Sequence, residues 1–231
     1  MKKTNDKQLL SELLNMHNLL TVFDEEHLDN FNLYRLKPGE IACSVGDNLD
    51  ELLLLVSGRV KISTPLPNGK SLLLRFNNSL SIIGELEFVT RRNAKNTVEC
   101  VSECMLIGIK FTLLYEHYYN NPSFLQYIVH HLAYRLYSSN NTSTLNLLTR
   151  VENRLASYLL SMSTNINGTF VEEIKTSSLV ETAELLGTSY RHLKRVINEL
   201  VERDIIEKRN GLILVKNVKK LEELADGIKY E

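Results

Sequence analysis

SLVETAELLGTSYRHLKRVINELVER, residues 178–203, is the stretch that decides the fold. A capping box at Ser178 predicts a short helix that runs through Leu186. Gly187-Thr188 then predicts a tight turn, and a second helix is predicted over residues 189–203. Helical spacing places four apolar side chains of this second helix on one buried face: Leu193, Val196, Ile197 and Leu200.

The other face of the second helix is polar and basic. It carries the side chains that we expect to contact DNA: Ser189, Tyr190, Arg191, Lys194, Arg195 and Asn198. Arginine can donate to both acceptors of guanine, and asparagine can make a two-bond contact with adenine. Two helices joined by a tight turn, with such a face exposed, predict a helix that enters the major groove of double-stranded DNA. The alternative is an ordinary surface helix whose charges only face water.

The residues after this helix predict a small β-hairpin. Residues 205–215 form two short apolar runs around Asn210-Gly211, a dipeptide typical of hairpin turns. Lys208 and Arg209 lie in this predicted wing and are expected to contact phosphate. Residues 188–220 contain nine basic and four acidic residues, although the whole chain has 27 basic and 28 acidic residues. A basic region inside a neutral total is typical of phosphate binding.

Composition limits the protein to the globular class. The chain has 231 residues, of which 43% are hydrophobic and 24% are charged, which favours two modest domains. Neither a membrane-spanning run nor a secretory signal is visible, so we expect a cytoplasmic protein that does not contact membranes. Three cysteines without a C-x-x-C pair, Cys43, Cys100 and Cys104, predict packed, reduced thiols rather than disulfides or zinc ligands.

The amino-terminal half has the pattern of a β-barrel. After a predicted helix near residues 9–14, short β-type runs follow at 40–44, 51–56, 59–64 and 70–76, separated by turn signals, and residues 97–109 form a longer strand region. Turns about ten residues apart favour an antiparallel barrel or sandwich. Cys100 and Cys104 are an even number of residues apart, so one continuous strand would place them on the same face.

A long, nearly uncharged helix is predicted next. Asn121-Pro122 has the form of a helix start, and six apolar residues then recur at helical spacing: Phe124, Leu125, Ile128, Val129, Leu132 and Leu136. Residues 111–147 contain only two charged residues, Glu116 and Arg135. Pairing with the same helix of a second copy explains this composition, and packing wholly within one chain is the alternative. His130-His131 cannot chelate one ion, because adjacent helical residues point in different directions.

The first half resembles a cyclic-nucleotide-binding barrel. The resemblance rests on residues 37–40, Gly46-Asp47, residues 52–58 and residues 83–86, which read IGEL. It implies a phosphate-binding cassette and an effector site at Gly84, Glu85, Leu86, Arg92 and Lys95. Residues 91–98 lack the expected arginine followed by Ser or Thr and Ala, which would face a cyclic phosphate. Lys95 lies at about the right distance from Gly84, and Arg92 would require a different loop length, so the motif indicates the fold more than the ligand. Gly84 and Glu85 could also be only a turn residue and a satisfied carboxylate.

The whole order of elements resembles the Crp/Fnr superfamily of bacterial transcription regulators, and within it the YeiL-type subgroup. Residues 83–87, 102–104, 153–156 and 186–193 carry this resemblance. It implies an α+β fold with an amino-terminal antiparallel β-barrel, a long dimerisation helix and a winged helix-turn-helix. The domains would be residues 1–120, 121–147 and 148–231.

The resemblance also implies what the protein does. It would be a homodimer that binds a palindromic operator, with RNA polymerase as a further partner if it activates. A small-molecule effector is a possible partner of unknown identity, and the departure from the cassette at residues 91–98 disfavours cyclic AMP in that role. The base-contacting positions fall on Tyr190, Arg191 and Arg195, where most relatives begin with arginine and then glutamate. The amino-terminal cysteines that hold an iron–sulfur cluster in some members are absent, so no cofactor and no metal are expected.

Two rival classes remain for comparison. The first is a cyclic-nucleotide or other ligand-sensing module that acts without DNA, which the basic region at 188–220 disfavours. The second is an enzyme with a metal-holding barrel, which residues 31–110 disfavour because they contain no histidine. No nucleophile with its base, no paired catalytic carboxylates and no phosphate-binding loop of an ATPase are visible, so the chain is not expected to be an enzyme.

Overall fold

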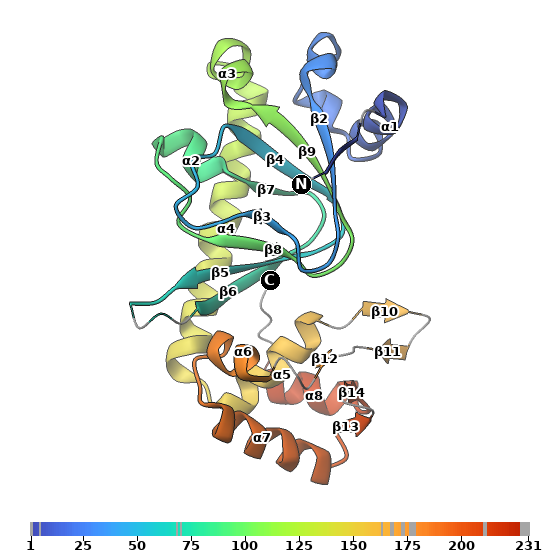
Figure 1. The fold of residues 1–231 in the computed structure, drawn as a ribbon, viewed down its shortest axis with the longest axis vertical. Coiled ribbons are helices and arrows are strands. Elements are labelled where there is room, and N and C mark those ends of the chain that lie inside the picture. Colours follow the sequence, from blue (N-terminus) through green and yellow to red (C-terminus); the bar gives the residue numbers. More distant parts are fainter. Residues whose placement is uncertain are drawn as a thin grey trace. The chain divides into compact units, whose positions relative to one another are not determined.

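The computed structural model describes residues 2–4, 6–67, 69, 71–162, 164–166, 169–171, 174–175, 179–209 and 212–226. The chain divides into two compact units (Figure 1). The first contains Met1–Thr64 and Phe76–Tyr137, and the second contains Pro65–Arg75 and Ser138–Glu231. Each unit is described by itself, and the domain boundaries at 120 and 147 stay a prediction.

The first unit is built on two antiparallel sheets, one of which also includes a strand, Ser71–Asn77, that begins in the segment Pro65–Arg75 of the second unit. Their strands are β1 (Lys2–Thr4), β2 (Asn32–Leu36), β3 (Ile41–Cys43), β4 (Glu51–Ser57), β5 (Val60–Pro65), β6 (Ser71–Asn77), β7 (Ser81–Ile83), β8 (Thr97–Cys100) and β9 (Cys104–Lys110). One sheet has the order β1-β2-β9-β4-β7 and the other has the order β3-β8-β5-β6. The predicted antiparallel architecture is confirmed: the pairings β1–β2, β2–β9, β4–β9, β4–β7, β3–β8 and β5–β8 are all antiparallel.

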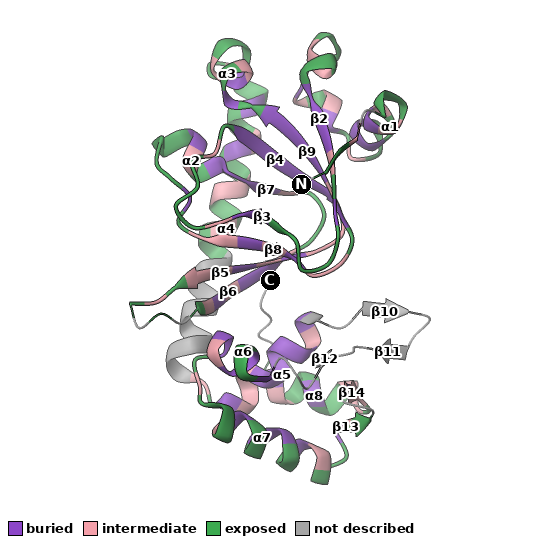
Figure 2. Cartoon of the chain, viewed as in Figure 1, coloured by how far each residue is buried: buried purple, intermediate pink, exposed green. Residues whose placement is uncertain are grey.

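The five-stranded sheet is covered on both faces. Every residue from Glu51 to Val56 is buried (Figure 2). Alternate β4 side chains, such as Leu52 and Leu54, join an apolar cluster with α1 (Lys7–Met16) and with Phe124 of the central helix. The remaining β4 side chains face the opposite side of the sheet, because successive side chains of a strand alternate.

The single strand region predicted over residues 97–109 is wrong. The chain turns at residues 101–103, so β8 belongs to the four-stranded sheet and β9 to the five-stranded sheet. The carbonyl oxygen of Arg59 holds this turn by accepting hydrogen bonds from the amides of Val101 (2.8 Å) and Ser102 (3.4 Å). Gly58 has a φ of +90°, and a Cβ there would lie 2.2 Å from the carbonyl oxygen of Glu103. Only glycine therefore lets these two turns pack together.

The central helix α4 (Pro122–Leu148) begins as the sequence predicts. The Asn121 side-chain oxygen accepts hydrogen bonds from the amides of Ser123 (2.9 Å) and Phe124 (3.2 Å). The predicted apolar stripe splits into two rows. An inner row packs against the barrel cluster and contains Phe124, Ile128 and Leu132. An outer row is exposed and contains Leu125, Val129 and Leu136, with Tyr134 and Tyr137 beside it.

Short helices complete the first unit. They are η1 (Leu19–Thr21), η2 (Glu25–Asn30), α2 (Glu85–Thr90), α3 (Phe111–Leu113) and the π-helical η3 (Leu114–Tyr118). In the described ranges, no helix of either unit combines the length and the apolar character needed to cross a membrane.

The second unit contains the predicted helix-turn-helix and wing. Its elements are α5 (Val151–Met162), β10 (Thr164–Ile166), β11 (Thr169–Val171), β12 (Ile174–Lys175), α6 (Leu179–Leu185), α7 (Tyr190–Glu202), β13 (Ile206–Arg209), β14 (Leu212–Val215) and α8 (Val218–Ala225). Strands β12, β14 and β13 form one sheet. The capping box at Ser178 and the turn at Asn210-Gly211 lie outside the described residues.

Candidate DNA interface and effector pocket

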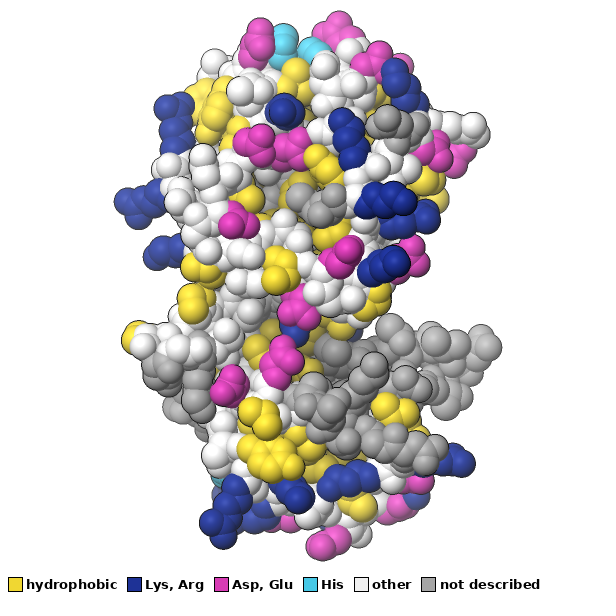
Figure 3. Space-filling model, in the orientation of Figure 1, with side chains coloured by type: hydrophobic (Ala, Val, Ile, Leu, Met, Phe, Trp, Pro, Cys, Tyr) yellow, Lys and Arg dark blue, Asp and Glu magenta, His cyan; other side chains and the backbone are white. Residues whose placement is uncertain are grey.

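Helix α7 separates an apolar face from a polar one, as the sequence predicts. Its buried side chains are Leu193, Val196, Ile197 and Leu200. Ser189 caps the helix, because its hydroxyl oxygen accepts a hydrogen bond from the amide of His192 (3.2 Å). The polar side chains are all exposed: Tyr190, Arg191, Lys194, Arg195 and Asn198. Figure 3 shows Lys and Arg side chains gathered at the lower edge of the view, where α7 lies. This face can offer guanidinium, ammonium, hydroxyl and amide groups to DNA.

One flank of the exposed face is arranged around Arg195. Its Nη2 lies 3.1 Å from Nε2 of His192, and its Nε lies 3.6 Å from Oε1 of Glu199. A guanidinium only donates hydrogen bonds, so Nε2 of His192 is the acceptor. This flank borders a cavity of about 430 Å³ between α5 and α7, which is also lined by Arg150, Glu152 and Arg154. The side chain of Arg195 is therefore held by two neighbours of its own helix.

The other flank faces the wing. Nζ of Lys208, on β13, donates a hydrogen bond to Oδ1 of Asn198. Burial lowers the pKa of Lys208, and the nearby charge of Lys194 lowers it further. Arg209 is exposed on the same strand. Since successive side chains of a strand alternate, Lys208 points to the face that α7 covers and Arg209 points to the opposite face. The two predicted phosphate contacts of the wing thus have different surroundings.

The cassette region of the barrel places Glu85 at the first residue of α2. Gly84 precedes it with a φ of +96°, and a Cβ there would lie only 3.1 Å from the carbonyl oxygen of Glu51. The side chain of Glu85 is 3% exposed and forms an ion pair with Arg135 of α4. Sequence reasoning did not assign Arg135 to this site. The available signal was its position as the single charged residue of an otherwise uncharged helix.

The space beside Glu85 is small. The cavity lined by Glu85, Gly84 and Arg135 has a volume of about 20 Å³, which is enough for roughly one water molecule. Pockets for small ligands usually have volumes of roughly 300 to 1,000 Å³. The arrangement in this structure therefore has no room for a nucleotide.

Three residues of the predicted effector site lie away from this cavity. Leu86, Arg92 and Lys95 are exposed and do not line it. The reason is the path of the chain after α2. The amide of buried Ala94 donates a hydrogen bond to the carbonyl oxygen of Asp47 (2.9 Å), so its neighbours Arg92 and Lys95 are left facing solvent.

Comparison with known proteins finds a family match for each half of the chain. Residues 33–116 match the family described as the cyclic nucleotide-binding domain, and residues 153–224 match the Crp-like helix-turn-helix domain. The chain is 28% identical to the regulatory protein YeiL of Escherichia coli O157:H7 over 174 residues, which cover 75% of this chain and 76% of YeiL. The chain belongs to the Crp/Fnr superfamily. It is a transcription regulator with a helix-turn-helix DNA-binding domain, and its homologues are regulators rather than enzymes.

Two further matches agree with this assignment. A CRP-like cAMP-activated global transcriptional regulator of Mycobacterium tuberculosis is 22% identical over 186 residues, with 79% of this chain and 83% of that protein covered. A crystal structure of a regulator of the Crp/Fnr family from Eubacterium rectale superposes with a TM-score of 0.77 at 18% identity and covers 93% of this chain and 99% of that one. The second match shows a shared fold. The α+β architecture predicted from the sequence is thereby confirmed for this Crp/Fnr regulator.

Arg154 connects the helix-turn-helix of this Crp/Fnr regulator to α5. Its Nε donates a hydrogen bond to the carbonyl oxygen of Leu186 (3.1 Å), at the turn between α6 and α7. Its Nη1 donates to the carbonyl oxygen of Thr149 (2.8 Å), just before α5. The motif at 153–156 therefore has a structural role, because it fixes the turn that positions α7.

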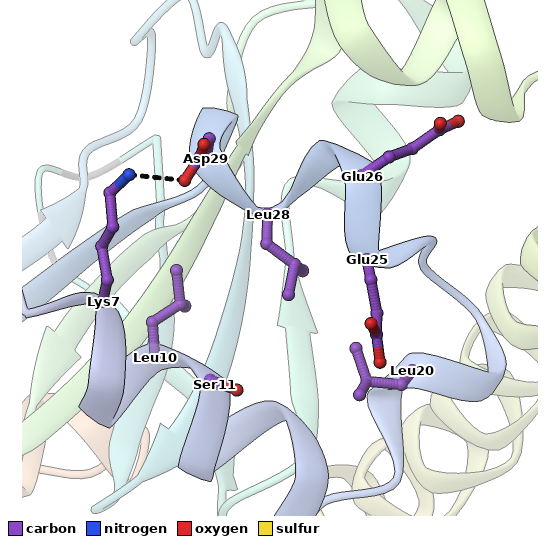
Figure 4. A pocket seen from close by; sticks show the side chains of 8 residues that line it. All are labelled: Lys7, Leu10, Ser11, Leu20, Glu25, Glu26, Leu28 and Asp29. Carbon is purple, nitrogen blue, oxygen red and sulfur yellow. Dashed lines mark hydrogen bonds and ion pairs between the residues drawn. The ribbon is translucent and has the colours of Figure 1, made fainter.

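The barrel unit of the Crp/Fnr regulator has a second hollow of about 410 Å³ between α1 and η2 (Figure 4). Leu10, Leu20 and Leu28 form its apolar part, and the ion pair between Lys7 and Asp29 (2.6 Å) lies at one side. Its remaining charged lining residues are carboxylates, Glu25 and Glu26. Among the described residues, Lys7 is the only cation that lines this hollow, and it is already paired with Asp29, so the hollow does not suit a phosphate group.

The three cysteines of this Crp/Fnr regulator are buried free thiols, as the sequence predicts. The Cys100 and Cys104 side chains meet where β8 and β9 adjoin, and their hydrogen bond raises the pKa of Cys100 and lowers that of Cys104. The prediction that one strand holds both is wrong, since they lie on different sheets. In the described part of the chain, no three His, Cys, Asp or Glu side chains form a group suited to a metal ion.

Proposed function

We propose that this Crp/Fnr regulator is a cytoplasmic homodimer that binds a palindromic operator, with α7 of each subunit in the major groove of one half-site. The observation that carries the proposal is the exposed polar face of α7 opposite its buried row of Leu193, Val196, Ile197 and Leu200. Arg191 and Arg195 are suited to guanine, and Tyr190 to an apolar or hydroxyl contact. The exposed wing cation Arg209 adds a contact with phosphate that is independent of sequence.

The exposed outer row of α4 supports the proposal that a second copy of the chain packs against this helix. Leu125, Val129 and Leu136 are 41%, 62% and 65% exposed, although they are large and apolar. An isologous dimer would bury each row against its copy and remove this surface from water. A dimer would also place two recognition helices one helical turn of DNA apart, which explains why a palindrome is expected. RNA polymerase would be a further partner of such a dimer if it activates transcription.

We further propose that the effector of this barrel is not cyclic AMP. The support is the ion pair between Glu85 and Arg135, together with the cavity of about 20 Å³ beside it. Arg92 and Lys95, the substitutes available in the sequence for the missing arginine, are exposed on the loop after α2. The guanidinium that lines this cavity, that of Arg135, is already paired with Glu85, so a cyclic phosphate would have to compete with a buried carboxylate for it.

Selection of bound fragments from a random DNA pool, followed by titration, tests the proposal. We expect the wild-type chain to enrich one palindromic motif and to bind it at least a thousandfold more tightly than unrelated DNA. Arg191→Ala and Arg195→Ala should lose this preference, whereas Lys219→Ala on α8, which also removes one exposed cation, should retain it. Failure of the wild-type chain to enrich any motif would refute sequence-specific binding.

A further inference from the structure

The contact between Lys208 and Asn198 determines which edge of the Asn198 amide faces the DNA. An ammonium group only donates hydrogen bonds, so the side-chain oxygen of Asn198 must be the atom that faces Lys208. The amide nitrogen, with its two donors, then points away from the wing. We propose that Lys208 is a specificity-determining residue, which orients Asn198 so that α7 presents donors alone at this position. The inference rests on the proposed function, since it concerns the same DNA interface.

The wing holds Lys208 in place by ordinary strand geometry. Lys208 is two residues after Ile206 and pairs across the hairpin with Ile213, and both isoleucines are 1% exposed. All three side chains therefore share the face of the wing that is packed, while Glu207 and Arg209 lie on the other face. Strand alternation thus makes Lys208, and not Arg209, the wing cation that meets α7.

The surroundings of Asn198 favour this orientation. Lys194 lies one turn earlier on α7, and its charge acts on Lys208. Asn198 therefore has two cations on its wing side, and a carbonyl oxygen there is stabilised, whereas an NH₂ group would be repelled. A flip of the amide would lose the hydrogen bond to Lys208 and bring donors against an ammonium group.

The orientation changes which bases Asn198 can read. Asparagine recognises adenine by donating to N7 and accepting from N6, which requires both the oxygen and the NH₂ group of its amide to face the base. With the oxygen directed at Lys208, Asn198 offers donors, and these match the two acceptors of guanine or the O4 atom of thymine. Lys208 would thereby set the base preference without touching a base itself. We expect guanine at the operator position that Asn198 contacts.

Motif selection with the full-length chain and three variants tests this inference. Asn198→Ala identifies the operator position that depends on Asn198, and the wild-type chain should prefer guanine there. Lys208→Met keeps the length of the side chain but frees the amide, so the preference at that position alone should shift toward adenine by about tenfold. Arg209→Met is the matched control, because it removes one wing cation from the other face. It should weaken binding to all sequences and leave the preference unchanged.

Several results would overturn the inference while leaving the proposed function intact. These are a wild-type preference for adenine at the position defined by Asn198→Ala, identical motifs for Lys208→Met and Arg209→Met, and no change of motif in Asn198→Ala. If the wild-type chain enriched no motif at all, the proposed function would fail first and this inference with it.

Discussion

Arg195 illustrates how single residues are arranged on the recognition helix. Its guanidinium is held from the preceding turn by His192 and from the following turn by Glu199. Because the guanidinium only donates, Nε2 of His192 must lack a proton for the hydrogen bond to form, and the ring proton then lies on Nδ1. His192 thus acts as a positioning residue for the arginine that is expected to read a base.

Substitution of His192 should separate positioning from base contact. We expect His192→Phe, which lacks an acceptor, to reduce discrimination at the base read by Arg195 by about 1 kcal/mol. His192→Gln retains an acceptor and should behave nearly as the wild type, while Arg195→Ala should lose about 1 to 3 kcal/mol at that base. Titrations against the selected operator and its single-base variant measure both effects. Equal discrimination by His192→Phe and the wild type would contradict the positioning role.

At this scale the sequence predicts burial well and contacts poorly. The row of Leu193, Val196, Ile197 and Leu200 follows from helical periodicity, because each buried position lies three or four residues from the next. The pairing of Asn198 with Lys208 does not follow from any period. It depends on how a strand ten residues away packs against the helix. The sequence does not predict the pair of Glu85 and Arg135 either, because these residues are 50 positions apart and meet only through tertiary packing.

Between elements, the ion pair of Glu85 and Arg135 connects α2 to α4 within the barrel unit. Arg135→Met should remove the guanidinium that pairs with the buried Glu85 carboxylate and lower the free energy of unfolding by about 3 kcal/mol. Adding Glu85→Gln to that variant removes the charge and should recover part of the loss. Urea denaturation followed by circular dichroism measures the two differences. If Arg135→Met were as stable as the wild type, the ion pair would contribute nothing to the free energy of unfolding.

The same pair bears on nucleotide binding. We expect calorimetry to detect no binding of cyclic AMP in the micromolar range, because the nucleotide would have to displace Arg135 and enlarge a cavity of about 20 Å³. The loss of a charge-assisted hydrogen bond to the phosphate adds about 1.5 to 3 kcal/mol to this cost. A micromolar dissociation constant that Glu85→Ala abolishes would show that the pocket opens and that the proposal is wrong.

Element boundaries follow from the sequence where local signals decide them. Asn121-Pro122 begins α4 and Ser189 begins α7, since a cap and the residues it contacts are close in the chain. The break between β8 and β9 has no such signal. It is stabilised by the carbonyl oxygen of Arg59, which lies more than forty residues earlier. A continuous apolar run therefore predicts one strand where two are found.

For the whole molecule, the outer row of α4 identifies the residues that should control assembly. A carboxylate in this row would be buried without a partner in the proposed dimer, so Val129→Glu and Leu136→Glu should produce monomers. Ser123→Glu adds the same charge at an exposed position of the first turn and serves as the control. Leu132 is a poor target because it packs against the barrel cluster. Sedimentation velocity reports the outcome, and dimers of both outer-row variants would place the interface elsewhere.

The lack of charge along α4 also bears on which partner a subunit of the proposed dimer would select. Paired helices usually reject foreign partners through charged residues that flank the apolar seam. Between residues 122 and 137 the single charged side chain is Arg135, which is already paired with Glu85 inside the barrel unit. A related subunit with a similar apolar row would meet no electrostatic barrier. Cells that express two such regulators would then contain mixed dimers, and these would recognise asymmetric sites that neither parent reads alone.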